Sequence, residues 1–145
     1  MLDDNPYHAT SVMIDGRVLL LAGASGSGKS DLALRLIDRG ALLLSDDYTQ
    51  LEERDGILHA MAPAQIAGCM EVRGVGIVEM AFAQEGPVAL LLDLDGDPPR
   101  LPDERLPTTT LRGVAIPTIA LAAFEASAPI KAEQALRLFG LGTAP

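Results

Sequence analysis

The chain has 145 residues, of which 48% are hydrophobic, and a formal net charge of −9 from 11 Lys and Arg against 20 Asp and Glu. This length suits one folded domain, which we expect to span residues 1–145. The acidic balance argues against general binding to nucleic acid or to an anionic membrane, because both need clustered positive charge. The single cysteine, Cys69, excludes an internal disulfide and fits a reducing compartment.

No apolar run approaches the roughly 18 residues that a membrane-spanning helix needs. The N-terminus also lacks the basic stretch and apolar run of a secretory signal. We therefore expect a soluble, cytoplasmic protein.

The first part of the chain predicts two strands and a helix. Residues 7–14 are typical of a strand of mixed periodicity, and Asp15-Gly16 is a hairpin turn that leads into the apolar strand of residues 17–22. Residues 31–39 follow a helical pattern, which ends before Gly40.

The middle of the chain predicts a short strand and a second hairpin. Residues 41–45 form a buried strand that ends at Asp46-Asp47. Residues 48–53 and 56–61 pair through an Asp-Gly turn, and residues 63–70 form a loop with one helical turn.

Two further strands are expected at residues 75–80 and 88–94. The second is almost wholly apolar, which indicates a central position in a sheet. Four prolines between residues 95 and 110 forbid regular structure across most of that window. Loops of this length in a compact domain are usually lids or binding loops.

The C-terminal part predicts a strand over residues 114–120, in which Pro117 marks an edge or a bulge, and a closing helix over residues 129–139. The two hairpins do not fit a purely alternating strand–helix pattern. We therefore expect an α/β fold with a mixed sheet, β-hairpins and a few flanking helices.

The most informative motif lies between the strand of residues 17–22 and the helix that follows it. It fits the phosphate-binding pattern G-x-x-x-x-G-K-[ST] and comprises Gly23, Ala24, Ser25, Gly26, Ser27, Gly28, Lys29 and Ser30. In such a P-loop, backbone N–H groups and the helix dipole converge on anionic oxygens. Lys29 can reach the β- and γ-phosphates, and the Ser30 hydroxyl can ligate Mg²⁺. The chain is predicted to bind a nucleotide.

Three other features narrow the choice among P-loop proteins. Asp46-Asp47 stands at the carboxyl end of a strand, where ligand-binding groups gather, and only one of the two acids should face the nucleotide. Residues 71–76 form a glycine-rich extended segment with an acid and a base on one face, and His8 lies one strand before the P-loop. Taken singly, these features also fit a solvated turn, a surface ion pair and a structural histidine.

Together, these residues resemble the HPr kinase/phosphorylase family, bacterial enzymes that act on a serine of the phosphocarrier protein HPr. The family's P-loop form G-x-S-G-x-G-K-S matches residues 23–30, and its Asp-Asp pair matches Asp46-Asp47. Its signature E-[IV]-R-G-[LV]-G-I matches residues 71–77. A histidine before the first hairpin matches His8, and an Arg-Leu pair in the proline-rich loop matches Arg105 and its neighbour.

The resemblance, which covers roughly residues 7–120, implies an ATP- and Mg²⁺-dependent protein serine kinase. Its substrate would be HPr or an HPr-like phosphocarrier, and the same site run backwards with inorganic phosphate would release pyrophosphate. The resemblance also suggests a homo-oligomer, a hexameric ring. Longer members have an N-terminal domain before His8 and an Arg-containing Pro-Gly motif after residues 116–120. We therefore expect a catalytic domain alone and leave the reverse reaction open.

The resemblance assigns a role to each site residue. Ser30 and Glu71 would hold Mg²⁺, directly or through water. Asp47 would accept the proton of the substrate serine, with His8 beside it to orient it. Arg105 would close over the transferred phosphoryl group and neutralise developing charge. The catalytic residues implied in this way are His8, Lys29, Asp47 and Arg105.

Other functions are compatible with a P-loop. A small-molecule kinase usually carries an arginine-rich lid, whereas residues 95–110 hold only Arg100 and Arg105. A nucleotide-dependent sensor would bind ATP and transfer nothing, and it would not need Asp47 or His8. A member of the family that has lost activity is disfavoured by its intact site residues.

Overall fold

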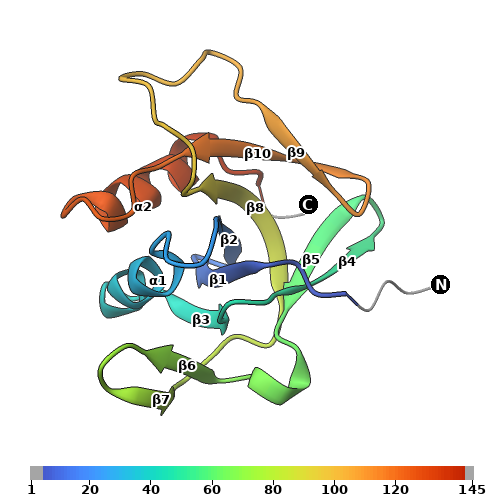
Figure 1. Ribbon diagram of the computed structural model, residues 1–145. Coiled ribbons are helices and arrows are strands. Elements are labelled where there is room, and N and C mark those ends of the chain that lie inside the picture. The colour runs from blue at the N-terminus through green and yellow to red at the C-terminus, as the bar shows by residue number, and fades with distance from the viewer. Residues whose placement is uncertain (1–4, 143–145) are drawn as a thin grey trace.

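The computed structural model in Figure 1 describes residues 5–142. The strands are β1 (Ala9–Ile14), β2 (Arg17–Ala22), β3 (Leu42–Ser45), β4 (Gln50–Arg54), β5 (Ile57–Met61), β6 (Cys69–Val72), β7 (Gly76–Glu79), β8 (Gly86–Asp93), β9 (Thr108–Leu111) and β10 (Val114–Ala120). The helices are α1 (Lys29–Asp38), the 3₁₀ turn η1 (Ala64–Ile66) and α2 (Ala128–Phe139). Within residues 5–142, no helix has the length and apolarity to cross a membrane.

Eight of the described strands form one mixed sheet. Its order is β3-β1-β2-β8-β10-β9, and the β4-β5 hairpin joins it where β5 pairs with β8. β2, β8 and β10 are parallel, whereas β1 is antiparallel to both β2 and β3. β6 and β7 form a separate hairpin, seen below β3 in Figure 1. The predicted α/β fold with a mixed sheet, hairpins and flanking helices is confirmed.

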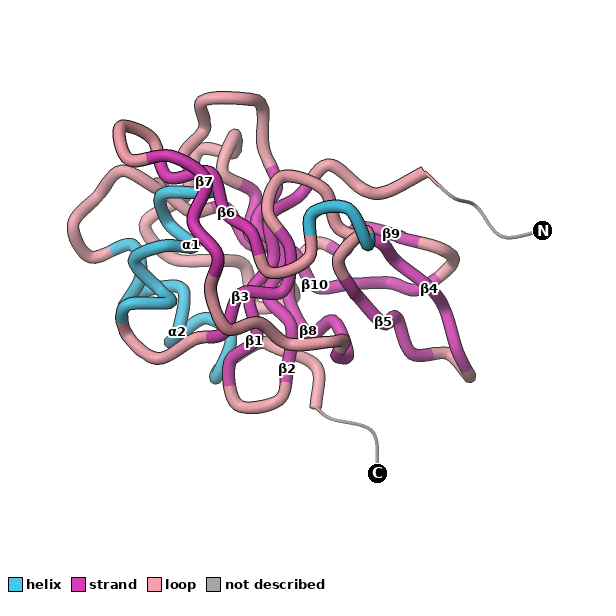
Figure 2. Tube along the Cα trace, turned by 90° about the horizontal axis from the view of Figure 1, so that it is seen from below, coloured by secondary structure: helices cyan, strands magenta, loops and turns pink. Residues whose placement is uncertain are grey.

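Both faces of the sheet are covered by other elements, and alternate residues of β2 pack into a different buried cluster on each face. Leu19 and Leu21 belong to a buried cluster with α1 and α2, whereas Val18 and Leu20 belong to a second cluster with the β4-β5 hairpin. Figure 2 shows α1 and α2 on one side of the sheet and this hairpin on the other. A strand covered on both faces must be apolar at nearly every position, which explains the continuous apolar runs of β2 and β8.

Both predicted Asp-Gly hairpin turns are confirmed. Asp15 and Gly16 have φ of 51° and 78°, and Asp55 and Gly56 have φ of 53° and 81°. Two consecutive left-handed residues give a turn whose twist matches that of the flanking strands. These turns therefore fix the register of the β1-β2 and β4-β5 hairpins.

The threonine run after β8 differs from the sequence prediction. Residues 95–107 have no regular structure, as their prolines predict. Thr108–Leu111 nevertheless form β9, so the expectation of an irregular segment up to residue 110 is wrong at its end. Threonine is β-branched and suits a strand, and the hydroxyls of Thr109 and Thr118 lie 2.6 Å apart across the β9-β10 pair.

Pro117 stands where β10 changes partners. The Val114–Pro117 half pairs with β9, and the Thr118–Ala120 half pairs with β8. Pro117 is therefore hydrogen-bonded on one side of the strand only, and the N–H that proline lacks is not needed on the other side.

The central position of β8 predicts the effect of a cavity there. Leu90 is fully buried in β8, so Leu90→Ala should lower the free energy of unfolding by about 2–5 kcal/mol. Leu101→Ala removes the same atoms from a side chain that is 76% exposed and should change stability by less than about 0.5 kcal/mol. Urea unfolding followed by circular dichroism measures both. Equal losses in the two variants would contradict this placement of β8.

Candidate active site

Several strands end at one edge of the sheet. β2, β8 and β10 are parallel, and β3 runs in the same direction because β1 is antiparallel to both β3 and β2. The segments that follow these strands leave at the same edge, where β1 begins. This edge brings together the P-loop (residues 23–30), Asp46-Asp47, Asp93 and His8.

The P-loop joins β2 directly to α1, which is the structural context that the motif requires. Gly26 and Gly28 adopt φ of +86° and +97°, a conformation that L side chains rarely adopt. Gly28 caps α1 without any side-chain hydrogen bond to the first turn. The N–H groups at this helix end are therefore not capped by a side chain and can donate hydrogen bonds to an anion.

Lys29 is folded over the loop. The residue is only 6% exposed, and its Nζ donates to the carbonyl oxygens of Gly23 at 2.8 Å and Ala24 at 3.1 Å. No carboxylate between residues 5 and 142 forms an ion pair with it. The nearby Ser27 hydroxyl is buried and has no hydrogen-bond partner in the described part of the chain. A buried cation without a counter-ion favours an anionic ligand.

Asp46 faces the P-loop. Its carboxylate accepts hydrogen bonds from the Ser30 hydroxyl at 2.6 Å, the Thr10 hydroxyl at 3.4 Å and the backbone N–H of Glu71 at 3.1 Å. The Glu71 carboxylate is exposed. The sequence marked the Asp-Asp pair, but Asp46 was not among the predicted site residues. The Asp46 carboxylate and the Ser30 hydroxyl that it contacts are hard oxygen ligands of the kind that Mg²⁺ prefers.

The Asp47 side chain contacts His8 and not Ser30 of the P-loop. Its φ of +67° is left-handed, and its N–H donates to the Thr10 hydroxyl at 3.0 Å. The Asp47 Oδ1 lies 3.0 Å from His8 Nε2, and the His8 ring stacks on Tyr48 with ring centroids 5.2 Å apart. The side chains of His8 and Asp47 are 39% and 55% exposed, so the pair is accessible to a large substrate.

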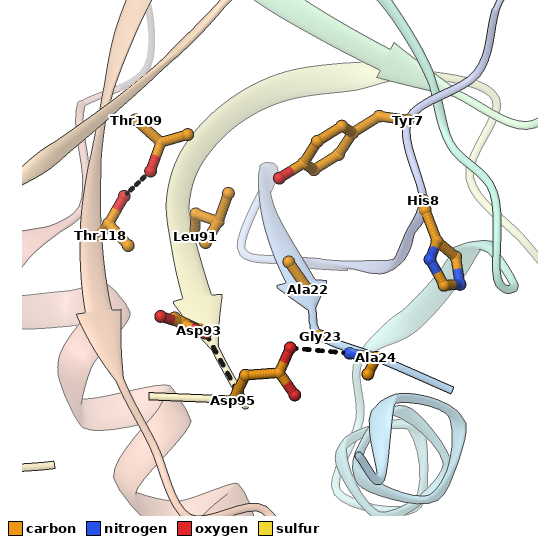
Figure 3. Close-up of a pocket in the computed structure, with 10 residues that line it drawn as sticks. All are labelled: Tyr7, His8, Ala22, Gly23, Ala24, Leu91, Asp93, Asp95, Thr109 and Thr118. Atoms are coloured by element: carbon orange, nitrogen blue, oxygen red, sulfur yellow. Dashed lines mark hydrogen bonds between the residues drawn. The ribbon is translucent and has the colours of Figure 1, made fainter. Parts of the chain in front are cut away.

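A cavity of about 450 Å³ opens beside the start of the P-loop (Figure 3). Tyr7 and His8 line one side of it, and Asp93 and Asp95 line the other. Burial, and then the charge of Asp93, raise the pKa of the Tyr7 phenol, so its hydroxyl stays protonated and can donate a hydrogen bond. The Asp95 carboxylate accepts the N–H of Ala24 at 2.9 Å.

Asp93 and Asp95 were not predicted as site residues. Asp93 pairs in register with Ala22, at the end of the strand next to the P-loop strand. Its Oδ1 accepts the N–H groups of Asp95 at 3.0 Å and Gly96 at 3.1 Å, which holds Asp95 against the P-loop. The sequence did offer a signal, because Asp93 ends an apolar strand that was expected to be central. Ligands of open α/β sheets bind at the carboxyl ends of such strands.

Arg105 makes no contact in the described residues that joins it to the other predicted site residues. It belongs to the exposed segment of residues 95–107, and no hydrogen bond or ion pair joins it to another residue in the described range 5–142. A role at the transferred phosphoryl group requires this segment to close, and that role stays a prediction.

Comparison with known protein families matches residues 1–84 to the family described as HPr Serine kinase C-terminal domain. Two similar relatives are named HPr kinase/phosphorylase. The one from Clostridium novyi (strain NT) is 42% identical over 73 residues, which cover 50% of this chain and 24% of that protein. The one from Clostridium perfringens (strain SM101 / Type A) is 40% identical over 81 residues, which cover 56% of this chain and 26% of that protein. The match thus spans about a quarter of the length of these relatives.

A solved structure extends the similarity to most of the chain. The Hpr(Ser) kinase/phosphatase from Coxiella burnetii superposes with a TM-score of 0.79 at 27% sequence identity, over 92% of this chain and 89% of that chain. The resemblance deduced from the motifs is confirmed. Because the family match covers more than half of its residues, this chain belongs to the HPr serine kinase C-terminal domain family.

Proposed function

We propose that this protein is an ATP- and Mg²⁺-dependent kinase that transfers a phosphoryl group to a serine of HPr or an HPr-like phosphocarrier. The observation that carries the proposal is the contact of 3.0 Å between Asp47 and His8 at the sheet edge that also holds the P-loop lysine. Phosphoryl transfer needs a positioned base and charge neutralisation rather than covalent catalysis. The Asp47 carboxylate beside His8 and the buried Lys29 ammonium are groups of these two kinds, and two relatives are named HPr kinase/phosphorylase.

The P-loop would bind the triphosphate. Three features of the described residues 5–142 fit an anionic ligand: the N-terminus of α1 without a side-chain cap, the buried Lys29 ammonium without a counter-ion, and the Ser27 hydroxyl without a hydrogen-bond partner. On binding, Lys29 would exchange the carbonyl oxygens of Gly23 and Ala24 for phosphate oxygens.

The residues around Ser30 fit a magnesium ion. The Ser30 hydroxyl is 2.6 Å from Asp46, and Glu71 is tied to the same carboxylate through its backbone N–H. Ser30 and Glu71, together with Asp46, would therefore hold Mg²⁺ directly or through water. When bound, the ion supplies positive charge that neutralises the phosphate oxygens.

Asp47 would take the proton from the substrate serine hydroxyl, and His8 would hold the carboxylate in place. The exposure of this pair suits a serine carried on the surface of another protein. In the reverse direction inorganic phosphate would attack the phosphorus of the phosphoserine and form pyrophosphate, and Asp47 would return the proton to the serine oxygen as its bond to phosphorus breaks. Arg105 would join the site when residues 95–107 close. We further propose that residues 1–145 form one catalytic domain, and that the protein acts in the cytoplasm and assembles into a homo-oligomer.

The proposed kinase activity is tested with Mg²⁺, radiolabelled ATP and purified HPr-like phosphocarriers. We expect acid-stable label on the carrier, because phosphoserine survives acid whereas phosphohistidine does not. Lys29→Ala should abolish the label, and Arg137→Ala, which removes an exposed cation from α2, should keep it. Nucleotide binding without label on any carrier would favour a sensor, and label on a small molecule would favour a small-molecule kinase.

Replacing the proposed base separates chemistry from binding. Asp47→Asn should lower the rate of transfer by about 10²–10⁴-fold and leave the affinity for MgATP within a few-fold. Asp15→Asn is a matched control, because Asp15 is another aspartate with a positive φ, of 51°. Single-turnover rates and calorimetric titrations measure both variants. Full activity in Asp47→Asn would rule out Asp47 as the base.

The contact between Ser30 and Asp46 predicts a change in metal dependence. Asp46→Asn should raise the Mg²⁺ concentration for half-maximal transfer by about tenfold or more, because a charged ligand oxygen becomes a neutral one. The measurement is the initial rate as a function of free Mg²⁺ at fixed ATP. An unchanged metal requirement would place Asp46 outside the magnesium site.

A further inference from the structure

We propose that the cavity between the loop after β8 and the loop after β10 is the nucleobase subsite of the P-loop, and that the base stacks on Phe124. The cavity has a volume of about 600 Å³. Its walls come from Ser27 of the P-loop, residues 94–98 after β8 and residues 122–125 after β10. This inference rests on the proposed nucleotide binding and adds the side chain that would recognise the base.

The direction of the triphosphate places the base on this side. In the proposed reaction the γ-phosphate must meet the serine near Asp47 and His8. These residues follow β3 and precede β1, the two strands on one side of β2 in the sheet. The nucleoside must then leave the P-loop on the opposite side, toward β8 and β10. Ligands of open α/β sheets bind in the crevice outside the carboxyl ends of the strands, and this cavity lies there.

Phe124 is an aromatic ring held open to solvent beside the P-loop. A Cβ on Gly28 would lie 3.2 Å from the Cε1 and Cζ atoms of Phe124, so part of the ring rests against this glycine. The side chain is nevertheless 73% exposed. Exposure of a large apolar ring costs free energy unless something covers it, and a base provides a planar surface for stacking.

Arg35 fixes the loop that carries Phe124. Its Nη1 donates to the carbonyl oxygen of Glu125 at 3.1 Å, and its Nη2 donates to that of Ala123. The Arg35 Nε lies 3.0 Å from an oxygen of Asp31 on the same helix. Two hydrogen bonds, one on each side of residue 124, thus tie the loop to α1, the helix that begins at the P-loop. The ring is positioned before a ligand arrives, which lowers the entropic cost of binding.

The negatively charged side chains that line the cavity favour an uncharged nucleobase over a phosphate group. Its charged wall residues are Asp95, Asp97 and Glu125, and no Lys or Arg is among the described residues that line it. Carboxylates repel phosphate oxygens and accept hydrogen bonds from an exocyclic amine. The apolar walls, which include Leu94 and Ala123, complete a site for an uncharged, amine-bearing purine such as adenine.

Titration calorimetry with two ligands tests this subsite. MgATP carries a base, whereas magnesium tripolyphosphate presents the same phosphate groups without one. Phe124→Ala should weaken MgATP binding by about tenfold and leave tripolyphosphate binding within about twofold. Phe124→Trp should retain the affinity for MgATP. Leu138→Ala is the matched control, since Leu138 is 74% exposed on α2 and does not line the cavity, and it should change neither affinity.

Each alternative outcome has a definite meaning. Equal weakening of both ligands in Phe124→Ala would show that the ring only supports the P-loop through Gly28, and would overturn the inference. Unchanged MgATP binding in that variant would overturn it as well, and would leave Phe124 as a surface for another protein. If the unaltered protein bound neither ligand, the proposed nucleotide binding itself would fail.

Discussion

The position of β1 between β2 and β3 is the constraint on which the site depends. Because β1 is antiparallel to both neighbours, β2 and β3 run in the same direction and end where β1 begins. The register pairs Ala9 with Ala22 and Ser11 with Ser45. These pairings bring His8 next to the P-loop and to Asp47, and the two-residue turn at Asp15-Gly16 holds them, since a slip of one residue would reverse every side chain.

The two faces of the sheet give this edge its rigidity. Leucines of β2 alternate between the cluster under the helices and the cluster under the β4-β5 hairpin, so neither face can shift without opening a cavity. The P-loop rises from this framework, and its glycines supply the backbone conformations that the turn needs. Gly28 is constrained twice, by its φ of +97° and by the Phe124 ring that rests against it.

The side chains that flank the P-loop differ between its two sides. The amides of α1 and Lys29 form its cationic centre, Asp46 and Asp47 lie on the side of β3, and Phe124 with its acidic neighbours lies on the side of β10. In the proposed reaction the phosphates would lie toward the acids of β3, where the metal ion offsets their repulsion, and the base would lie toward Phe124. The proposed chemistry and the proposed base recognition follow from the same asymmetry.

Local patterns in the sequence were sufficient for the P-loop, the Asp-Gly hairpins, the apolar central strand and the closing helix, because periodicity and turn chemistry are properties of neighbouring residues. They could not decide which acid faces Ser30, since the answer depends on the left-handed φ of Asp47 and on its contact with Thr10 of β1. They also missed β9, whose threonines become a strand only when β10 pairs with them. Phe124 became a candidate for base binding only when folding placed it against Gly28, far away along the chain. The sequence by itself thus determined most of the elements and the family, and the tertiary structure decided which side chains meet, because long-range strand pairing sets the register that brings them together.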